Sequence, residues 1–258
     1  MDLLKPNYLD TTTAVVINNA TDRVSYLFDR DTTFQYVSNG MNNDLTTVSI
    51  RINFNETLPV SRIALVEHNL KAFTVFYNGA TANTFALTSS GSTVSSAFSS
   101  NSETSHYLMA SQTYCTSVTF DLKSTIVADQ EKAIGFMVLS DPHLTLDRPP
   151  PAKGYKISID PQDTVHKLSD GGTRIQNISD KYMVTLSYSY LTTSQRNSLK
   201  TVYDRHQEIV FCPFGTTTSW DKVIFPCVWN GNFDFFQFSD DAATAGFSGK
   251  INLLETPR

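Results

Sequence analysis

The fold of this chain is decided first by the stretch Val48-Ser49-Ile50-Arg51-Ile52-Asn53-Phe54, in which four apolar residues alternate with three polar ones. Successive side chains of a β-strand point to opposite faces, so this stretch predicts a strand with one buried face. Further short apolar stretches separated by turn residues follow at 62–66, 73–77, 117–122 and 134–139. This succession of short strands, with little helical periodicity, predicts a β-sandwich for the first half of the chain.

Two segments between these strands have turn or loop composition. Residues 55–59, with the sequence Asn-Glu-Thr-Leu-Pro, predict a turn between the first two strands. Residues 81–117 are rich in Ser, Thr and Asn and have two interpretations. They form either a long connection with one strand near 84–87, or an adaptable hydrogen-bonding surface loop.

The second half of the chain has a different order of elements. A strand is expected at 155–159, followed by a hairpin whose turn contains Asp170-Gly171 and by a long strand over 182–190. Thr192 or Thr193 is a suitable N-cap for a helix that runs to about His206. Further strands follow, at 209–211, 223–225, 228–229, 233–238 and 249–254. Strands, one helix and strands again predict an α+β roll.

The run Pro149-Pro150-Pro151 predicts the boundary between the two halves, because a polyproline segment is stiff and separates domains at a set distance. The predicted domains are therefore 1–145 and 156–258, joined by a proline-rich linker at 146–155.

Composition and charge exclude several classes of protein. The net charge is −5, and residues 1–145 hold 8 of the 20 basic and 13 of the 25 acidic side chains. Neither half has the basic face of a nucleic-acid-binding protein, and no stretch has the length of a membrane span. Nucleic acid and membrane insertion are therefore not expected. Residues 1–6 lack the apolar core of a signal peptide, so we expect synthesis in the cytosol and reduced cysteines.

The sequence also lacks the common short motifs of catalysis. The five histidines fall in five separate segments, none at a metal-ligand spacing from another. We therefore expect no enzyme, no catalytic residue, no cofactor and no metal site. Cys212 and Cys227 are interpreted as buried thiols in neighbouring strands rather than metal ligands. Asp29 and Asp31 form either a calcium-binding pair or a solvated turn, and this alternative stays open.

The densest group of aromatic residues lies between 220 and 238. Phe233 and Phe235 alternate as core residues of a strand do, which places Phe236 and Phe238 on the opposite face. A strand that is apolar on both faces needs a second covering layer. Either more of the same domain or a neighbouring subunit supplies this layer, and on the second alternative we predict a subunit interface that includes Trp229, Phe236 and Phe238.

Two groups of stretches resemble a known family. Residues 27–33 (LFDRDTT), the strand 48–54 and residues 63–73 (IALVEHNLKAF) resemble a discoidin-like, or galactose-binding-like, jelly roll. The version they resemble is carried by tail proteins of tailed bacteriophages, where a His-Asn-Leu turn follows the second core strand. Residues 225–233 and 246–256 resemble the end of the roll-shaped ring domain of phage distal tail and tail-tip proteins.

The resemblance implies a mostly β fold, with an N-terminal jelly-roll β-sandwich and a C-terminal α+β roll with one central helix. It also implies a structural protein of the virion tail tip or baseplate, assembled in the host cytoplasm as a homo-oligomeric ring, with a hexamer favoured. Its partners would be other phage tail proteins, with host-surface glycan as a candidate ligand of the outward jelly roll. The alternative is a carbohydrate-binding adhesion protein without ring assembly. Tail-tip relatives with an iron–sulfur cluster use four cysteines, so that feature is not carried over.

Overall fold

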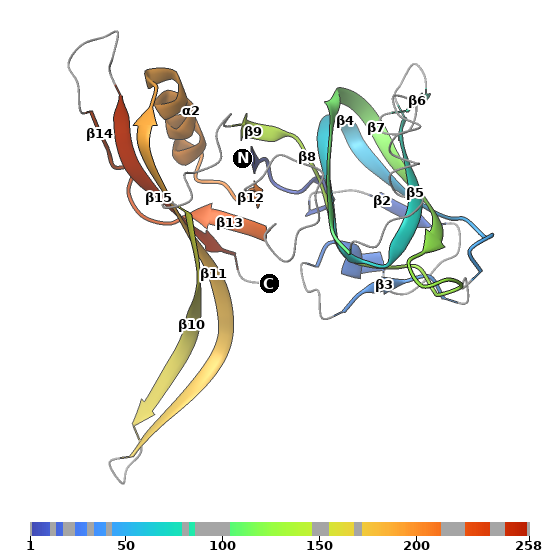
Figure 1. Cartoon of the computed structure of the whole chain (residues 1–258), viewed down its shortest axis with the longest axis horizontal. Helices are drawn as coiled ribbons and strands as arrows, with labels where there is room; N and C mark the ends of the chain where they lie inside the picture. Colours follow the sequence, from blue (N-terminus) through green and yellow to red (C-terminus); the bar gives the residue numbers. More distant parts are fainter. Residues whose placement is uncertain are drawn as a thin grey trace. The chain divides into compact units, whose positions relative to one another are not determined.

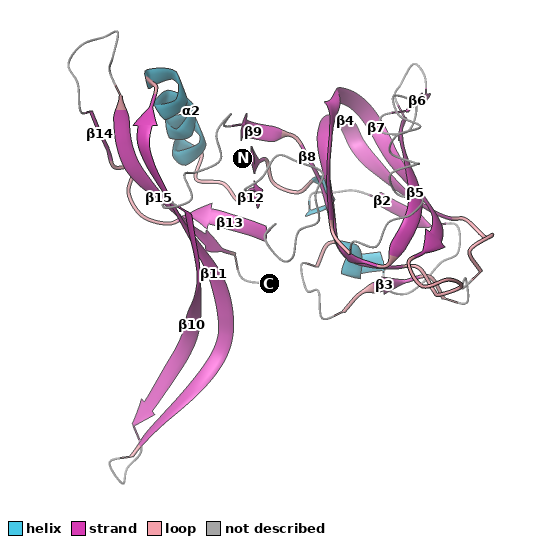
Figure 2. Cartoon of the chain, in the orientation of Figure 1, coloured by secondary structure: helices cyan, strands magenta, loops and turns pink. Residues whose placement is uncertain are grey.

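The computed structural model describes residues 2–10, 14–17, 24–29, 34–39, 43–78, 83–85, 104–145, 155–167, 172–212, 225–237 and 246–256. This part of the chain is mostly β, with one α-helix, as the sequence predicts (Figure 2). It forms two compact units. The jelly-roll unit lies within residues 4–142, and the roll unit lies within residues 1–3, 143–214 and 225–257.

One antiparallel sheet of seven strands builds the jelly-roll unit, in the order β3-β8-β4-β7-β5-β6, with β2 paired to β4. It curls round a single core to make the predicted sandwich (Figure 1). The strands are β2 (Ala14–Ile17), β3 (Tyr36–Val37), β4 (Val48–His68), β5 (Leu70–Asn78), β6 (Asn83–Phe85), β7 (His106–Thr125) and β8 (Ala133–Ser140).

The long strand β4 takes part in both layers of this sandwich. Its first part pairs with β2 and β7, and its last part pairs with β7 and β8. The predicted turn at 55–59 is wrong, because the chain bends there without reversing. The bend is a break in register between Asn53 and Leu58, after which pairing with β7 resumes at Cys115. A turn sequence can open a bulge in a strand when both flanking segments bury a face in the same core.

Alternation along β4 agrees with the expected burial. Val48, Ile50 and Ile52 are fully buried, whereas Ser49 and Arg51 point away from the core. Of the segment 81–117, β6 and the first part of β7 are strands, and residues 86–103 lie outside the described part of the chain.

The roll unit is built on a sheet of eight strands in the order β10-β11-β15-β13-β12-β1-β9, with β14 paired to β15. Its elements are β1 (Asp2–Leu4), β9 (Pro142–Thr145), β10 (Tyr155–Lys167), β11 (Thr173–Leu191), α2 (Thr193–Asp204), β12 (Ile209–Cys212), β13 (Phe225–Trp229), β14 (Phe235–Gln237) and β15 (Phe247–Glu255). Leu199 and Val202 of α2 pack on the sheet in a core with Val184, Leu186 and Leu253.

The sheet of the roll unit takes strands from both ends of the predicted first domain. β1 and β9 belong to residues 1–145 by sequence, yet both are strands of the second sheet. Backbone hydrogen bonds between segments distant in sequence place β1 and β9 in this sheet. Dividing the chain at the proline run assigns both strands to the first domain, because such hydrogen bonds leave no pattern in the local sequence. The proline run itself, with the rest of 146–154, lies outside the described residues.

The helix begins where the sequence predicts. Thr192 is the N-cap, and its hydroxyl accepts a hydrogen bond from the backbone N–H of Gln195 at 3.2 Å. The Gln195 side chain in turn accepts from the backbone N–H of Thr192 at 3.0 Å. This reciprocal capping box satisfies two donors that a helix N-terminus otherwise leaves without partners.

Replacing the N-cap should therefore destabilise the roll unit. For Thr192→Ala we expect a loss of about 1 kcal/mol in the free energy of unfolding, because one capping acceptor disappears. Thr193→Ala is the matched control, since Thr193 is an exposed residue inside the helix rather than its cap. Urea unfolding followed by tryptophan fluorescence measures both, and equal effects of the two substitutions would contradict the assigned cap.

Candidate functional site

The hairpin of β10 and β11 is longer than the sheet that supports it. The two strands pair from Tyr155 opposite Leu186 to Lys167 opposite Thr173. β15, on the other side of β11, pairs only with residues from Met183 to Leu191. Residues 159–167 and 173–182 are therefore a two-stranded ribbon, which we call the arm, and no third strand joins it among the described residues. Figure 1 shows the arm extending away from α2.

One face of β10 carries an exposed apolar stripe, made of Ile157, Ile159 and Val165. These residues are separated by even numbers of positions, so their side chains share a face. Ile157 lies opposite the core residue Val184, so this is the face that α2 covers closer to the core. The exposed fractions are 37% for Ile157 and 58% for both Ile159 and Val165. Exposed apolar residues of this face thus continue beyond the core to Ile159, and Val165 lies farther along the same strand, after Pro161 and Asp163.

An arm of this kind needs a covering surface to be stable. A two-stranded hairpin alone is marginally stable in water. Burying one Val or Ile side chain fully contributes about 1.5–3 kcal/mol, and much of this is not realised while the stripe is exposed. Among the strands that the structure describes, β10 is also an edge strand over its whole length, so its outer backbone groups can pair with another strand. The arm is the described feature best suited to bind another protein surface.

The three predicted interface residues, Trp229, Phe236 and Phe238, differ in their surroundings. Trp229 is half-buried and packs inside its own unit, with ring centroids 5.3 Å from Tyr203 and 5.9 Å from Phe233. Phe236 is 62% exposed. Phe238 lies outside the described residues. Phe233 and Phe235 pack against the core of the roll unit, which confirms their predicted inward face.

The turn His68-Asn69-Leu70, which supports the jelly-roll resemblance, has a structural role. Asn69 lies between β4 and β5, and its side-chain amide donates to the carbonyl of Glu131 at 2.8 Å. Its side-chain oxygen accepts from the backbone N–H of Ala133, also at 2.8 Å. The same side chain therefore fixes the start of β8 against the turn.

His68, the residue before it, forms a buried pair with His106. The backbone N–H of Leu70 donates to His68 Nδ1 at 3.1 Å. His68 therefore carries its proton on Nε2, which donates to His106 Nδ1 at 2.7 Å. Burial, together with the neighbouring His106, lowers the pKa of His68 to about 3. Both imidazoles are thus neutral hydrogen-bonded core groups, and sequence patterns do not detect their pairing because it joins β4 to β7.

This pair should make the jelly-roll unit sensitive to acid. The pKa of His68 is depressed in the folded state relative to about 6.5 in the unfolded chain, so stability is complete above pH 6.5 and is lost as the pH falls toward 3. Between pH 6.5 and 4.5 we expect a loss of about 2–3 kcal/mol. Amide hydrogen exchange of β4 and β5 across this range measures it.

Two variants test the assignment of this loss to His68. In His68→Gln the pH dependence between 6.5 and 4.5 should become much shallower, whatever the change in stability at neutral pH. In His166→Gln, which removes an exposed histidine of the roll unit, it should remain. An unchanged slope in His68→Gln would show that another group titrates.

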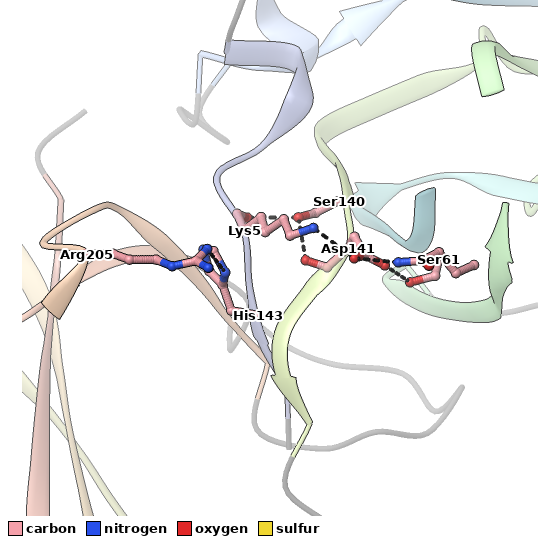
Figure 3. Close-up of polar contacts among 7 residues, drawn as sticks. Lys5, Ser61, Ser140, Asp141, His143 and Arg205 are labelled. Carbon is pink, nitrogen blue, oxygen red and sulfur yellow. Dashed lines mark hydrogen bonds and ion pairs between the residues drawn. The ribbon is translucent and has the colours of Figure 1, made fainter. Parts of the chain in front are cut away.

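A second buried polar cluster surrounds Asp141 (Figure 3). Its carboxylate accepts hydrogen bonds from Ser61 at 2.7 Å, from Gln112 at 2.9 Å and from the Lys5 ammonium at 3.0 Å. Burial alone would raise the pKa of Asp141, but the hydrogen bonds from Ser61, Lys5 and Gln112 outweigh it and lower the pKa. A carboxylate with this many donors is held as a structural anion rather than as an acid–base group.

In the roll unit, Arg205 donates to Nδ1 of His143 at 2.9 Å (Figure 3).

The cysteines are confirmed as buried thiols. Cys212 and Cys227 are fully buried in β12 and β13, which pair with each other, and Cys115 is fully buried in the jelly-roll unit. Burial raises the pKa of the Cys115 thiol to about 12 and that of Cys227 well above its ordinary value. Such thiols are poor nucleophiles and poor metal ligands at neutral pH.

The described residues hold no group of three or more His, Cys, Asp or Glu side chains placed to bind a metal ion. Asp29 lies in the described part of the chain, whereas Asp31 lies outside it, so the calcium alternative stays a prediction. Among the helices of the described segments, none has the length and apolar character needed to cross a membrane.

A loop of the jelly-roll unit presents an aromatic pair that sequence patterns did not single out. Tyr26 follows the start of a 3-10 helix (Val24–Leu27), and Phe34 precedes β3. Their rings stack with centroids 5.6 Å apart and an angle of 27° between planes, and Phe34 is 55% exposed. Phe34 thus presents an exposed aromatic ring that stacks on the half-buried Tyr26, and such a ring can contact a ligand.

No protein-family model matches the chain, and no curated protein matches it. Solved structures do match, over about half of the chain. A chitosan-binding module of a chitosanase/glucanase from Paenibacillus sp. IK-5 has 14% identity and a TM-score of 0.39, over 52% of this chain and 98% of that one. The family 32 carbohydrate-binding module of Clostridium perfringens NanJ, in complex with galactose, has 9% identity and a TM-score of 0.41, over 55% and 100%.

A pectin-binding carbohydrate-binding module has 13% identity and a TM-score of 0.33, over 49% of this chain and 88% of that one. None of these three is a phage tail protein. The resemblance to phage tail proteins thus has no counterpart among them.

Proposed function

We propose that this chain is a non-enzymatic structural subunit of a phage tail tip or baseplate, which assembles into a ring through its roll unit and presents its jelly-roll unit outward. The arm is the observation that carries this proposal. It exposes Ile159 and Val165 of the apolar stripe, and a strand edge that no other strand of the described part of the chain pairs with, two features that a protein acting as a monomer avoids. A hexamer remains the favoured ring, assembled in the host cytoplasm and located in the virion tail.

Two buried polar clusters of the jelly-roll unit support a structural role rather than catalysis. The neutral pair His68–His106 and the fully hydrogen-bonded Asp141 stabilise the sandwich from inside. A rigid sandwich of this kind is suited to presenting a surface to other tail proteins or to the host.

Assembly should depend on the stripe. The full chain should form a discrete oligomer in native mass spectrometry and sedimentation velocity. The double variant Ile157→Thr with Ile159→Thr keeps β-branched residues on β10 but removes apolar area, so its dissociation constant should rise by about 30-fold, equivalent to about 2 kcal/mol.

Leu45→Thr is the matched control, because Leu45 is 93% exposed in the jelly-roll unit and lies outside the arm. This variant should assemble like the natural chain. A natural chain that stays strictly monomeric at high concentration would overturn the proposed ring.

A carbohydrate-binding adhesion protein without ring assembly is the second candidate. The structural neighbours named above are carbohydrate-binding modules, and the stacked pair Tyr26–Phe34 is the observation in this chain that favours the same activity. An exposed aromatic ring can stack on the apolar face of a sugar.

Glycan binding can be tested on the full chain with an array of host-surface and plant polysaccharides. Phe34→Ala should lower the affinity for any bound glycan by about tenfold or more, because the stacking ring is lost. Tyr114→Ala removes an aromatic side chain that is 63% exposed elsewhere in the same unit, and it should leave binding unchanged. A natural chain that binds no glycan would exclude this candidate and leave the jelly-roll unit as a protein-binding surface.

A further inference from the structure

β1 and β9 are neighbours in the sheet of the roll unit, although the jelly-roll unit separates them along the chain. The order β12-β1-β9 means that, among the described strands, β9 joins this sheet only through β1. The chain leaves β1 at Leu4, builds the jelly-roll unit and re-enters the sheet at Pro142. The jelly-roll unit is therefore an insertion between two adjacent strands, and its two ends must meet before those strands can pair.

Within the jelly-roll unit, hydrogen bonds fasten the residue that follows β1 to the residues that precede β9. The backbone N–H of Lys5 donates to the carbonyl of Asp141 at 2.9 Å, and the Ser140 hydroxyl donates to the carbonyl of Lys5 at 2.8 Å. The Lys5 ammonium lies 3.0 Å from the Asp141 carboxylate (Figure 3). We call these contacts of Lys5 with Ser140 and Asp141 the clasp.

The clasp is connected to the strands of the sandwich. Asn7 is fully buried, and its side-chain amide forms hydrogen bonds of 2.8 and 3.0 Å with the backbone of β8. The Asp141 carboxylate also accepts from Ser61 of β4 and from Gln112 of β7. The geometry of the clasp therefore depends on the placement of β4, β7 and β8, which only the folded jelly-roll unit provides.

Without a folded jelly-roll unit, pairing of β1 with β9 would have to close a long flexible loop. Lys5 and Asp141 are 136 positions apart. The probability that the ends of a flexible chain meet falls with about the 3/2 power of its length, so this loop closes on the order of 100-fold less often than a hairpin loop of about five residues. β1 has only three residues and few hydrogen bonds to offset that loss.

We propose that the clasp makes the completion of the roll sheet depend on the folding of the jelly-roll unit. The folded jelly-roll unit holds β1 next to β9, and β1 supplies Leu3 to the core of the roll unit. The dependence runs in one direction. Each clasp contact lies inside the jelly-roll unit, and the core of that unit is built within residues 8–139, without a contribution from the roll unit.

Two matched core substitutions in the full chain test this direction. Val75→Ala weakens the core of the jelly-roll unit and Val184→Ala weakens that of the roll unit, and both side chains are fully buried. In Val75→Ala, amide hydrogen exchange should become about tenfold faster in β4 and also in β1 and β9. β15 should keep its exchange rate, because it pairs with β11 and β13 rather than with β1. In Val184→Ala, β4 should keep its rate.

Three outcomes of this experiment would overturn the dependence. The first is unchanged exchange of β1 and β9 in Val75→Ala. The second is faster exchange of β4 in Val184→Ala, which would make the dependence mutual. The third is equal acceleration of β15 in Val75→Ala, which would show that the whole chain unfolds as one unit.

A change of charge tests whether the clasp is the point of coupling. Asp141→Asn keeps the size of the side chain but removes the charge that attracts the Lys5 ammonium. Exchange of β1 and β9 should become about tenfold faster, and the acceleration should exceed that of β4. Asp204→Asn is the matched control, because Asp204 forms an exposed ion pair with Lys200, and it should leave β1 and β9 unchanged. No acceleration in Asp141→Asn, or equal acceleration of all three strands, would contradict the role of the clasp.

Discussion

The length of β11 relative to its support is the constraint on which the functional interpretation depends. β11 has 19 residues, but β15 pairs only with its second part. The core of the roll unit ends where that support ends, whereas β10 and β11 continue beyond it, and Ile159 and Val165 of β10 are exposed there. A pair of strands that extends beyond its own core exposes the backbone N–H and C=O groups of its edge together with apolar side chains. Burial against another surface is the ordinary way to stabilise both.

In the jelly-roll unit, by contrast, the polar side chains of His68, Asn69 and Asp141 have their hydrogen-bond partners inside the unit. His68 and His106 are neutral and hydrogen-bonded to each other. The side-chain amide of Asn69 both donates and accepts a hydrogen bond, and Asp141 accepts hydrogen bonds from three side chains. Because a buried polar group without partners is costly, these clusters require the strands to be placed accurately. These polar residues are part of the scaffold of the jelly-roll unit, whereas Phe34, which stacks on Tyr26, is exposed.

Sequence patterns predicted the features that depend on near neighbours along the chain. The one-sided strand at Val48–Phe54, the cap at Thr192 and the inward face of Phe233 and Phe235 all follow from local periodicity or local hydrogen bonding. Burial of Cys212 and Cys227 in paired strands was predicted on the same basis. The subunit interface predicted at Trp229, Phe236 and Phe238 stays a prediction, since Trp229 packs within its own unit and Phe236 is exposed.

Sequence alone therefore determined that this chain is mostly β. It also determined that the first half is a succession of short strands, whereas the second half has strands, one helix and strands again. Both follow because side-chain alternation and helix capping act over a few residues. Only the tertiary structure decided that 55–59 bends a continuous strand, that β1 joins the sheet of the roll unit, and that His68 meets His106. It also decided which apolar faces remain exposed. These outcomes depend on pairing between segments far apart in sequence, and periodicity within one segment carries no information about its partner.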